Sequence, residues 1–186
     1  MIFGVLPLSS FLGLRLSLFW HAATLAGVVA IFGAPAASGK NVSSKSKHII
    51  GATATLTEME SGLKFSARID TGAHSCSLHV EKIEIENESS SRVRNVGKTA
   101  RITLKDAKGK TARIKAKIAE AVRVKSSALS RGEYDHRYKV RLKLKWKDVE
   151  KEVLVTLNDR TDMEFPLLIG RNFLRGDFLV DVDQND

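Results

Sequence analysis

The chain has 186 residues, a formal net charge of +9 at pH 7 and a single cysteine. One cysteine excludes an internal disulfide, and this length suffices for one domain with its own hydrophobic core. The basic stretches lack the recurring aromatic residues on which bases would stack, so we expect no nucleic-acid partner. The positive charge instead favours a solvated strand face, or a face that meets an anionic envelope surface.

The N-terminal segment predicts export. Residues 1–36 carry one charged side chain, Arg15, before an apolar run over residues 16–32. Small residues follow at Ala34-Pro35-Ala36, which is typical of a signal peptide that is cleaved near this point. We therefore expect a periplasmic protein; the alternative is an inner-membrane anchor formed by residues 1–36. Residues 37–47 are predicted to be a flexible linker, and residues 48–186 the folded domain.

Hydrophobic and polar residues alternate along several later stretches, which is typical of strands with one face in a core and the other in water. The turn Asp106-Ala107-Lys108-Gly109 joins two of these stretches into a hairpin. Residues 86–98 are predicted to be a polar loop. The pattern indicates an all-β fold, a small barrel or sandwich. The apolar members of the alternation are Leu63, Phe65, Ala67, Ile69, Ile102, Leu104, Ala112, Ile114, Ala116, Ile118, Val140, Leu142, Leu144, Trp146, Val153, Val155 and Leu157.

The most specific motif begins at the end of the first of these strands, where Ile69 precedes Asp70-Thr71-Gly72-Ala73. The strand interior is apolar, so the Asp70 carboxylate emerges at its tip. Thr71 can hydrogen-bond backbone groups, and Gly72 allows a sharp turn and close approach of another backbone. On its own, Asp70 could be an ordinary turn-forming aspartate.

A second segment follows about a hundred residues later, Leu167-Leu168-Ile169-Gly170-Arg171-Asn172. One short helix is expected directly after Gly170. Under the turn-residue interpretation of Asp70, this second segment would be an unexplained coincidence.

Together the two segments resemble the active-site unit of retropepsin-like aspartic peptidases. Residues 69–79 and 157–181 are similar to the bacterial members long labelled ATP-dependent zinc proteases, and Gly132-Glu133 with Arg137 resembles their connecting motif. The resemblance implies a small closed acid-protease barrel with one short C-terminal helix. It implies that Asp70 is catalytic, that Thr71, Gly72 and Ala73 build its loop, and that the loop is braced by the later segment. That bracing segment comprises Ile169, Gly170, Arg171 and Asn172.

The resemblance also implies an oligomeric state. Aspartic peptidases use two carboxylates that share one proton, and this chain has one Asp-Thr-Gly. A working site therefore requires a homodimer in which each subunit contributes Asp70, with a peptide or protein as substrate. The alternative from another class is a non-catalytic module that binds a peptide or an envelope partner on the same fold.

We expect neither a metal nor another cofactor. His74 and His79 are five residues apart in an extended segment, which directs them to opposite faces, and no paired-cysteine or His-Glu-x-x-His motif occurs. A zinc hydrolase stays as a third alternative. Cys76 is expected to be a small buried apolar side chain, with a catalytic thiol as its alternative.

We assign the flap that would cover a bound substrate to the predicted hairpin turn. A glycine-bearing turn over residues 106–111 is the candidate flap, and its lysines Lys105, Lys108 and Lys110 would suit acidic peptides.

Overall fold

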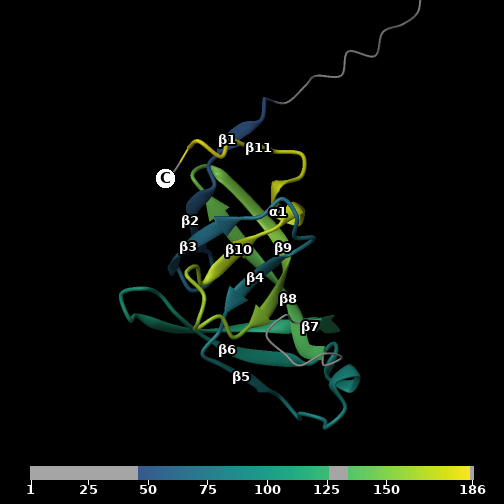
Figure 1. The fold of residues 1–186 in the computed structure, drawn as a ribbon. Helices are drawn as coiled ribbons and strands as arrows, with labels where there is room; N and C mark the ends of the chain where they lie inside the picture. The colour runs from purple at the N-terminus through teal and green to yellow at the C-terminus, as the bar shows by residue number, and fades with distance from the viewer. Residues whose placement is uncertain (1–45, 126–133, 185–186) are drawn as a thin grey trace, which may run out of the picture. The chain divides into compact units, whose positions relative to one another are not determined.

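The computed structural model describes residues 46–125 and 134–184 (Figure 1). The predicted signal peptide, residues 1–36, and most of the predicted linker therefore lie outside the described residues, as does Gly132-Glu133. No helix of the described part is long and apolar enough to cross a membrane.

Strands dominate the described residues, and the all-β prediction is confirmed. One short α-helix follows Gly170, as predicted. In chain order the elements are β1 (His48–Ile50), β2 (Thr53–Glu58), β3 (Lys64–Ile69), β4 (Cys76–His79), β5 (Lys82–Ile85), the 3₁₀ helix η1 (Arg92–Asn95), β6 (Thr99–Lys105), β7 (Thr111–Lys125), β8 (Tyr134–Trp146), β9 (Val149–Asn158), β10 (Leu167–Ile169), α1 (Arg171–Leu174) and β11 (Phe178–Val180).

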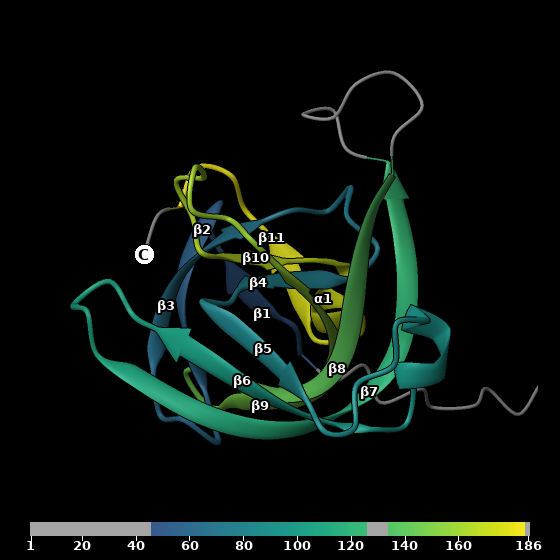
Figure 2. The same cartoon turned by 90° about the horizontal axis from the view of Figure 1, so that it is seen from below.

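The strand pairings explain how distant segments meet. Nine strands form one sheet in the order β2-β3-β10-β4-β9-β8-β7-β6-β5, and β2 also pairs with β8. Six of them, β2, β3, β10, β4, β9 and β8, are therefore linked in a closed circuit of hydrogen-bonded neighbours. β7, β6 and β5 extend this circuit on one side (Figure 2). β1 and β11 form a separate parallel pair near the chain ends of the described domain (Figure 1).

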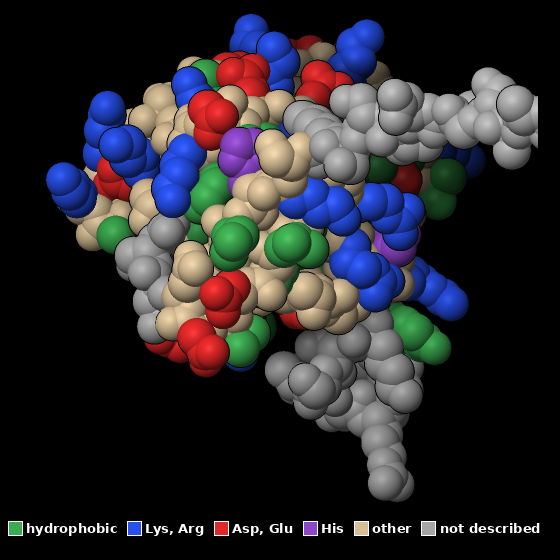
Figure 3. All heavy atoms as spheres, turned by 90° about the horizontal axis from the view of Figure 1, so that it is seen from above, with side chains coloured by type: hydrophobic (Ala, Val, Ile, Leu, Met, Phe, Trp, Pro, Cys, Tyr) green, Lys and Arg blue, Asp and Glu red, His purple; other side chains and the backbone are tan. Residues whose placement is uncertain are grey.

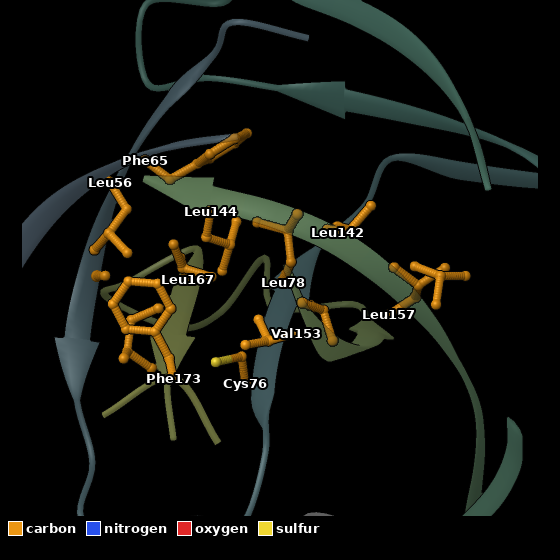
Figure 4. Close-up of a cluster of buried hydrophobic side chains, with 14 of the residues drawn as sticks. Leu56, Phe65, Cys76, Leu78, Leu142, Leu144, Val153, Leu157, Leu167 and Phe173 are labelled. Atoms are coloured by element: carbon orange, nitrogen blue, oxygen red, sulfur yellow. The ribbon is translucent and has the colours of Figure 1, made fainter. Parts of the chain in front are cut away.

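The alternating residues supply the core. Almost all of those predicted to face inward are buried, and Ala112 and Ala116 are partly buried against the same cluster. Figure 4 shows side chains from β2, β3, β4, β8, β9 and β10 meeting in the interior, with Cys76 and Phe173 among them. Full burial of such side chains contributes about 1.5–3 kcal/mol each, so this cluster holds the strands that carry the site.

The predicted polar loop over residues 86–98 contains more structure than expected. Asn95 at the end of η1 is fully buried. Its side-chain amide donates hydrogen bonds to the Tyr138 hydroxyl and to the Ser89 carbonyl, both at 2.9 Å, and its Oδ1 accepts from the Ser89 amide at 2.8 Å. One buried side chain, Asn95, therefore fixes the predicted polar loop against β8.

The predicted hairpin turn over residues 106–109 is confirmed, but its assignment as the flap that covers the active site is wrong. Asp106 Oδ1 accepts hydrogen bonds from the amides of Lys108 and Lys110, both at 2.9 Å, and closes the turn between β6 and β7. The Lys115 amide in β7 donates to Glu60 Oε1 at 3.1 Å, beside the turn between β2 and β3. This is the end of β3 opposite Asp70, and in Figures 1 and 2 the β6–β7 turn extends away from α1.

Candidate active site

The two predicted segments meet because β10 lies between β3 and β4. β10 pairs with β3 in parallel, with Ile169 opposite Ile69, and with β4 antiparallel. The Asp70 amide donates to the Ile169 carbonyl at 2.9 Å, and the Arg171 amide donates to the Ala73 carbonyl at 2.9 Å. Residues 70–75, which we call the Asp70 loop, are thus bonded on both sides to the chain around Gly170.

The Asp70 carboxylate is fixed by its own loop. Its Oδ1 accepts hydrogen bonds from the amides of Gly72, at 2.8 Å, and Ala73, at 3.0 Å. Asp70 is half-buried, while Thr71 and Gly72 are exposed. A Cβ atom on Gly72 would lie 3.1 Å from Oδ1. The carboxylate is therefore oriented by backbone amides and can still reach water.

Gly170 allows the two segments to approach. A Cβ atom at this position would lie 2.7 Å from both the carbonyl carbon and the carbonyl oxygen of Ser75, and 3.0 Å from the Ala73 carbonyl oxygen. These are backbone atoms, which cannot rotate away. Glycine is required because the Asp70 loop packs directly on residue 170.

The side chains of Arg171 and Asn172 bond the start of α1 to neighbouring segments. The Asn172 side-chain amide donates to the Leu154 carbonyl in β9 at 2.7 Å, and its Oδ1 accepts from the Cys76 amide at 3.0 Å. The Arg171 guanidinium donates to the Thr71 carbonyl at 3.3 Å. Asn172 thereby ties α1 to β4 and β9. The sequence does not predict these partners, because they are backbone groups, which every residue type has.

A cleft of about 450 Å³ lies beside the Asp70 loop. Residues 73–75 form one wall, and cations from β7, β8 and the segment after β9 line much of the rest. We call it the cationic cleft; its charged lining residues are Arg123, Arg137, Lys139 and Arg160. Arg137 pairs with Asp135 at 2.6 Å and Lys139 with Glu120 at 2.9 Å. Among the described residues Arg160 forms no ion pair, and sequence reasoning did not single it out.

A second hollow lies on the other side of the Asp70 loop. It is lined by Ala52, Thr53, Arg68, Ile69, Thr71, Val180 and Val182. Val182, like Leu179 and Ile49 of the β1–β11 pair, is half or more exposed. Figure 3 views the face that carries this pair and shows hydrophobic side chains at the surface. We call the hollow, with the exposed Val182, the apolar face.

The comparisons with known proteins agree with this geometry. The family model of the retropepsin-like aspartic endopeptidase RimB matches residues 49–186. The chain belongs to this RimB-like family. Among solved structures, the chain is similar to that of protein Lpg0085 from Legionella pneumophila, described as of unknown function (DUF785), with 26% identity and a TM-score of 0.60. That match covers 75% of this chain and 97% of the other. No curated protein matches the sequence significantly.

Three described histidines of this RimB-like chain lie near the site, in two different places. His74 is exposed on the Asp70 loop, whereas His79 lies on a separate groove with His136. Within residues 46–125 and 134–184, no three His, Cys, Asp or Glu side chains are placed to hold a metal ion together.

The chemistry of Cys76 disfavours its use as a nucleophile. The side chain is fully buried, and its Sγ lies 3.2 Å from Asn172 Oδ1, as a thiol donor would. Burial raises the pKa of the Cys76 thiol to about 11. Because the thiolate is the reactive form, the buried apolar role fits and the catalytic-thiol alternative does not.

Cys76 therefore predicts a loss of stability in alkali. A folded-state pKa raised above that of the unfolded chain contributes stability that is complete below pH 9 and lost as pH rises toward 11. Between about pH 8 and about pH 10.5, the free energy of unfolding of the wild type should fall by about 2 kcal/mol more than that of Cys76→Ala. Urea titrations of both proteins measure the difference, and equal losses would show that Cys76 ionises as readily in the fold as outside it.

Lys151 in β9 anchors the short helix that carries Arg171 and Asn172. Its ammonium donates to the carbonyls of Phe173, at 2.7 Å, and Arg175, at 3.0 Å, and to Asp177 Oδ2 at 2.8 Å. Helix α1 has only four residues, so its C-terminal carbonyls depend on such partners.

We expect Lys151→Met to lower the free energy of unfolding by about 2 kcal/mol, because three acceptors, two of them partly buried, lose a charged donor. Lys143→Met is the matched control: Lys143 is mainly exposed, and its ion pair with Glu150 spans 3.9 Å, so its loss should cost less than about 0.5 kcal/mol. Equal effects of the two substitutions would contradict the anchoring role.

Proposed function

We propose that the protein is an aspartic endopeptidase in which two copies of Asp70, one from each subunit of a homodimer, activate water for peptide-bond hydrolysis. The observation that carries the proposal is the orientation of the half-buried Asp70 carboxylate by the Gly72 and Ala73 amides, in a loop whose residues 73–75 line a cleft. Membership of the RimB-like family supports the same reaction class.

The chemistry needs one ionised and one protonated carboxylate. The ionised Asp70 takes a proton from water as its oxygen attacks the peptide carbonyl carbon, and the protonated Asp70 gives its proton to the carbonyl oxygen. The resulting diol collapses when the now protonated Asp70 gives its proton to the amide nitrogen and the C–N bond breaks. The other, ionised carboxylate takes the proton of one diol hydroxyl as the product C=O bond forms. Both carboxylates then return to their starting state with one shared proton.

The dimer would form through the apolar face. Two Asp70 side chains can share a proton only if their loops meet on a two-fold axis, and an isologous contact then also buries the surface next to each loop. Thr71 and the exposed Val182 lie on this surface. A second copy of the chain is the occupant that brings a second Asp70 there.

The cationic cleft suits an extended peptide with acidic side chains. Arg160 has no carboxylate partner among the described residues and lies 91% buried in the cleft lining, where a substrate carboxylate could neutralise it. We therefore still propose a preference for acidic peptides, but we assign it to the cationic cleft and not to the β6–β7 turn.

Export is proposed from the N-terminal segment alone, with an inner-membrane anchor as its alternative. Fractionation of cells that produce the full-length protein with a C-terminal tag tests both: a shortened soluble periplasmic product supports cleavage, and a full-length membrane-bound product supports the anchor.

Cleavage of a peptide library by the full-length protein tests the activity. The proposal predicts cleavage that survives a metal chelator and is absent from Asp70→Asn. Loss of cleavage on chelation would favour a zinc hydrolase. Absence of cleavage by a folded dimer would favour the non-catalytic binding module.

A further inference from the structure

The loop after β9 contributes Arg160 to the lining of the cationic cleft. It spans residues 159–166, and its Arg160 side chain is only 9% exposed. Arg160 Nε donates to the Phe165 carbonyl at 3.0 Å, and the Met163 amide donates to the Arg160 carbonyl at 2.9 Å. Arg160 is thus both a lining residue of the cleft and the centre of its own loop.

Keeping Arg160 in this place is unfavourable in the absence of a ligand. Its burial removes water from the guanidinium, and the like charge of Arg137 lies on the same cleft. Both effects lower the pKa of Arg160 from its usual range. The bond from Nε to the Phe165 carbonyl keeps the side chain there only while the loop keeps its shape, so a further contact must hold the loop.

His79 at the end of β4 provides that contact. Its Nδ1 accepts a hydrogen bond from the Arg160 backbone amide at 2.9 Å, and its own backbone amide donates to the Pro166 carbonyl at 2.8 Å. One residue therefore binds both ends of the loop. The side chain is only 14% exposed, so the imidazole is held within the fold.

The hydrogen bonding defines the tautomer of His79. Because Nδ1 accepts from an amide, the ring proton resides on Nε2, which lies 3.5 Å from Glu81 Oε1. Glu81 in turn pairs with Lys105 at 3.1 Å. Asp159 Oδ1, 3.6 Å from Nδ1, is occupied by the Thr161 hydroxyl and amide. The ring that accepts from the Arg160 amide is thus oriented by contacts at both of its nitrogens.

We infer that His79 is a positioning residue, which by holding both ends of the 159–166 loop keeps the Arg160 guanidinium in the cleft beside the Asp70 loop. The inference builds on the proposed function, since Arg160 would then receive an acidic substrate side chain. A histidine with only a structural role would stabilise the fold without any selective effect on charged ligands.

The test uses the full-length chain and a pair of substitutions at position 79. His79→Leu removes the acceptor, whereas His79→Asn places an amide oxygen near the position of Nδ1 and should restore it. Glu81→Gln is the matched control, because it alters the Nε2 side of the ring and leaves the Arg160 contact. The first readout is hydrogen exchange of the Arg160 backbone amide, which needs neither substrate nor activity.

The second readout is peptide affinity, measured with each variant at position 79 combined with the inactivating Asp70→Asn substitution. The two ligands are a labelled aspartate-rich peptide and the same peptide with asparagine in place of aspartate. His79→Leu should speed Arg160 amide exchange by about tenfold and weaken the acidic peptide by about tenfold, which corresponds to one charge-assisted hydrogen bond. The neutral peptide should be little affected. In an Arg160→Gln background, His79→Leu should have no further effect on affinity, because the two residues act as one unit.

Unchanged exchange of the Arg160 amide in His79→Leu would overturn the inference. So would an equal loss of affinity for both peptides, or a loss that persists in the Arg160→Gln background. If neither peptide binds at all, the proposed peptide substrate fails, and the exchange experiment by itself decides whether His79 holds Arg160.

Discussion

Asp70→Asn is expected to lower kcat for peptide hydrolysis by about 10³-fold or more, because a proton-transfer partner is removed from both subunits at once. The fold should persist: an asparagine Oδ1 can still accept from the Gly72 and Ala73 amides, which now hold the carboxylate at 2.8 and 3.0 Å. Steady-state kinetics and urea unfolding of the same preparation separate the two effects.

Asp148→Asn is the matched control for that experiment. Asp148 follows β8, is largely exposed, and lies 4.0 Å from His48, so its neutralisation should leave kcat unchanged. Full activity of Asp70→Asn would remove Asp70 from the chemistry. A parallel loss of stability would instead make the loss of activity a consequence of unfolding.

Gly170→Ala is expected to have the largest effect on stability, about 3 kcal/mol or more, because the added methyl group would overlap backbone atoms of the Asp70 loop. Three atoms of Ser75 and Ala73 lie within 3.0 Å of the new Cβ, and β3, β4 and β10 would have to separate to accommodate it. The free energy of unfolding from urea titration measures the cost, and activity should be lost with it.

Gly176→Ala separates steric overlap from the general cost of replacing a glycine. Gly176 has φ +90°, and a Cβ there meets nothing within 4 Å, so only the backbone strain of about 1–2 kcal/mol applies. Similar losses at the two positions would contradict the close approach of the Asp70 loop to Gly170.

The strands and each of the two motifs are predictable from the sequence because each has a local signal. Alternation over residues 140–146 reports burial directly, and Gly170 after an apolar triplet identifies the segment that meets Asp70. The family resemblance then related the two segments, which no local pattern could have done.

The remaining parts depend on tertiary geometry that leaves no local signal. The turn at Asp106 is predictable from its residues, but its separation from Asp70 follows from strand order and from the contact of Lys115 with Glu60. Lys151 resembles any other lysine of a basic strand until α1 packs against it. Arg160 and His79 lie eighty-one positions apart in the chain, and their hydrogen bond uses a backbone amide, so neither residue type indicates it.

The central claim is that two Asp70 side chains act together, and mixing subunits tests it most directly. Wild type and Asp70→Asn are combined in equal amounts, allowed to exchange subunits, and assayed for cleavage. After exchange, about a quarter of the dimers consist of two wild-type subunits, and these dimers hold about half of all wild-type subunits. If only dimers with two carboxylates are active, activity per wild-type subunit should therefore fall to about half. Activity per wild-type subunit that stays constant at every mixing ratio would contradict the paired site.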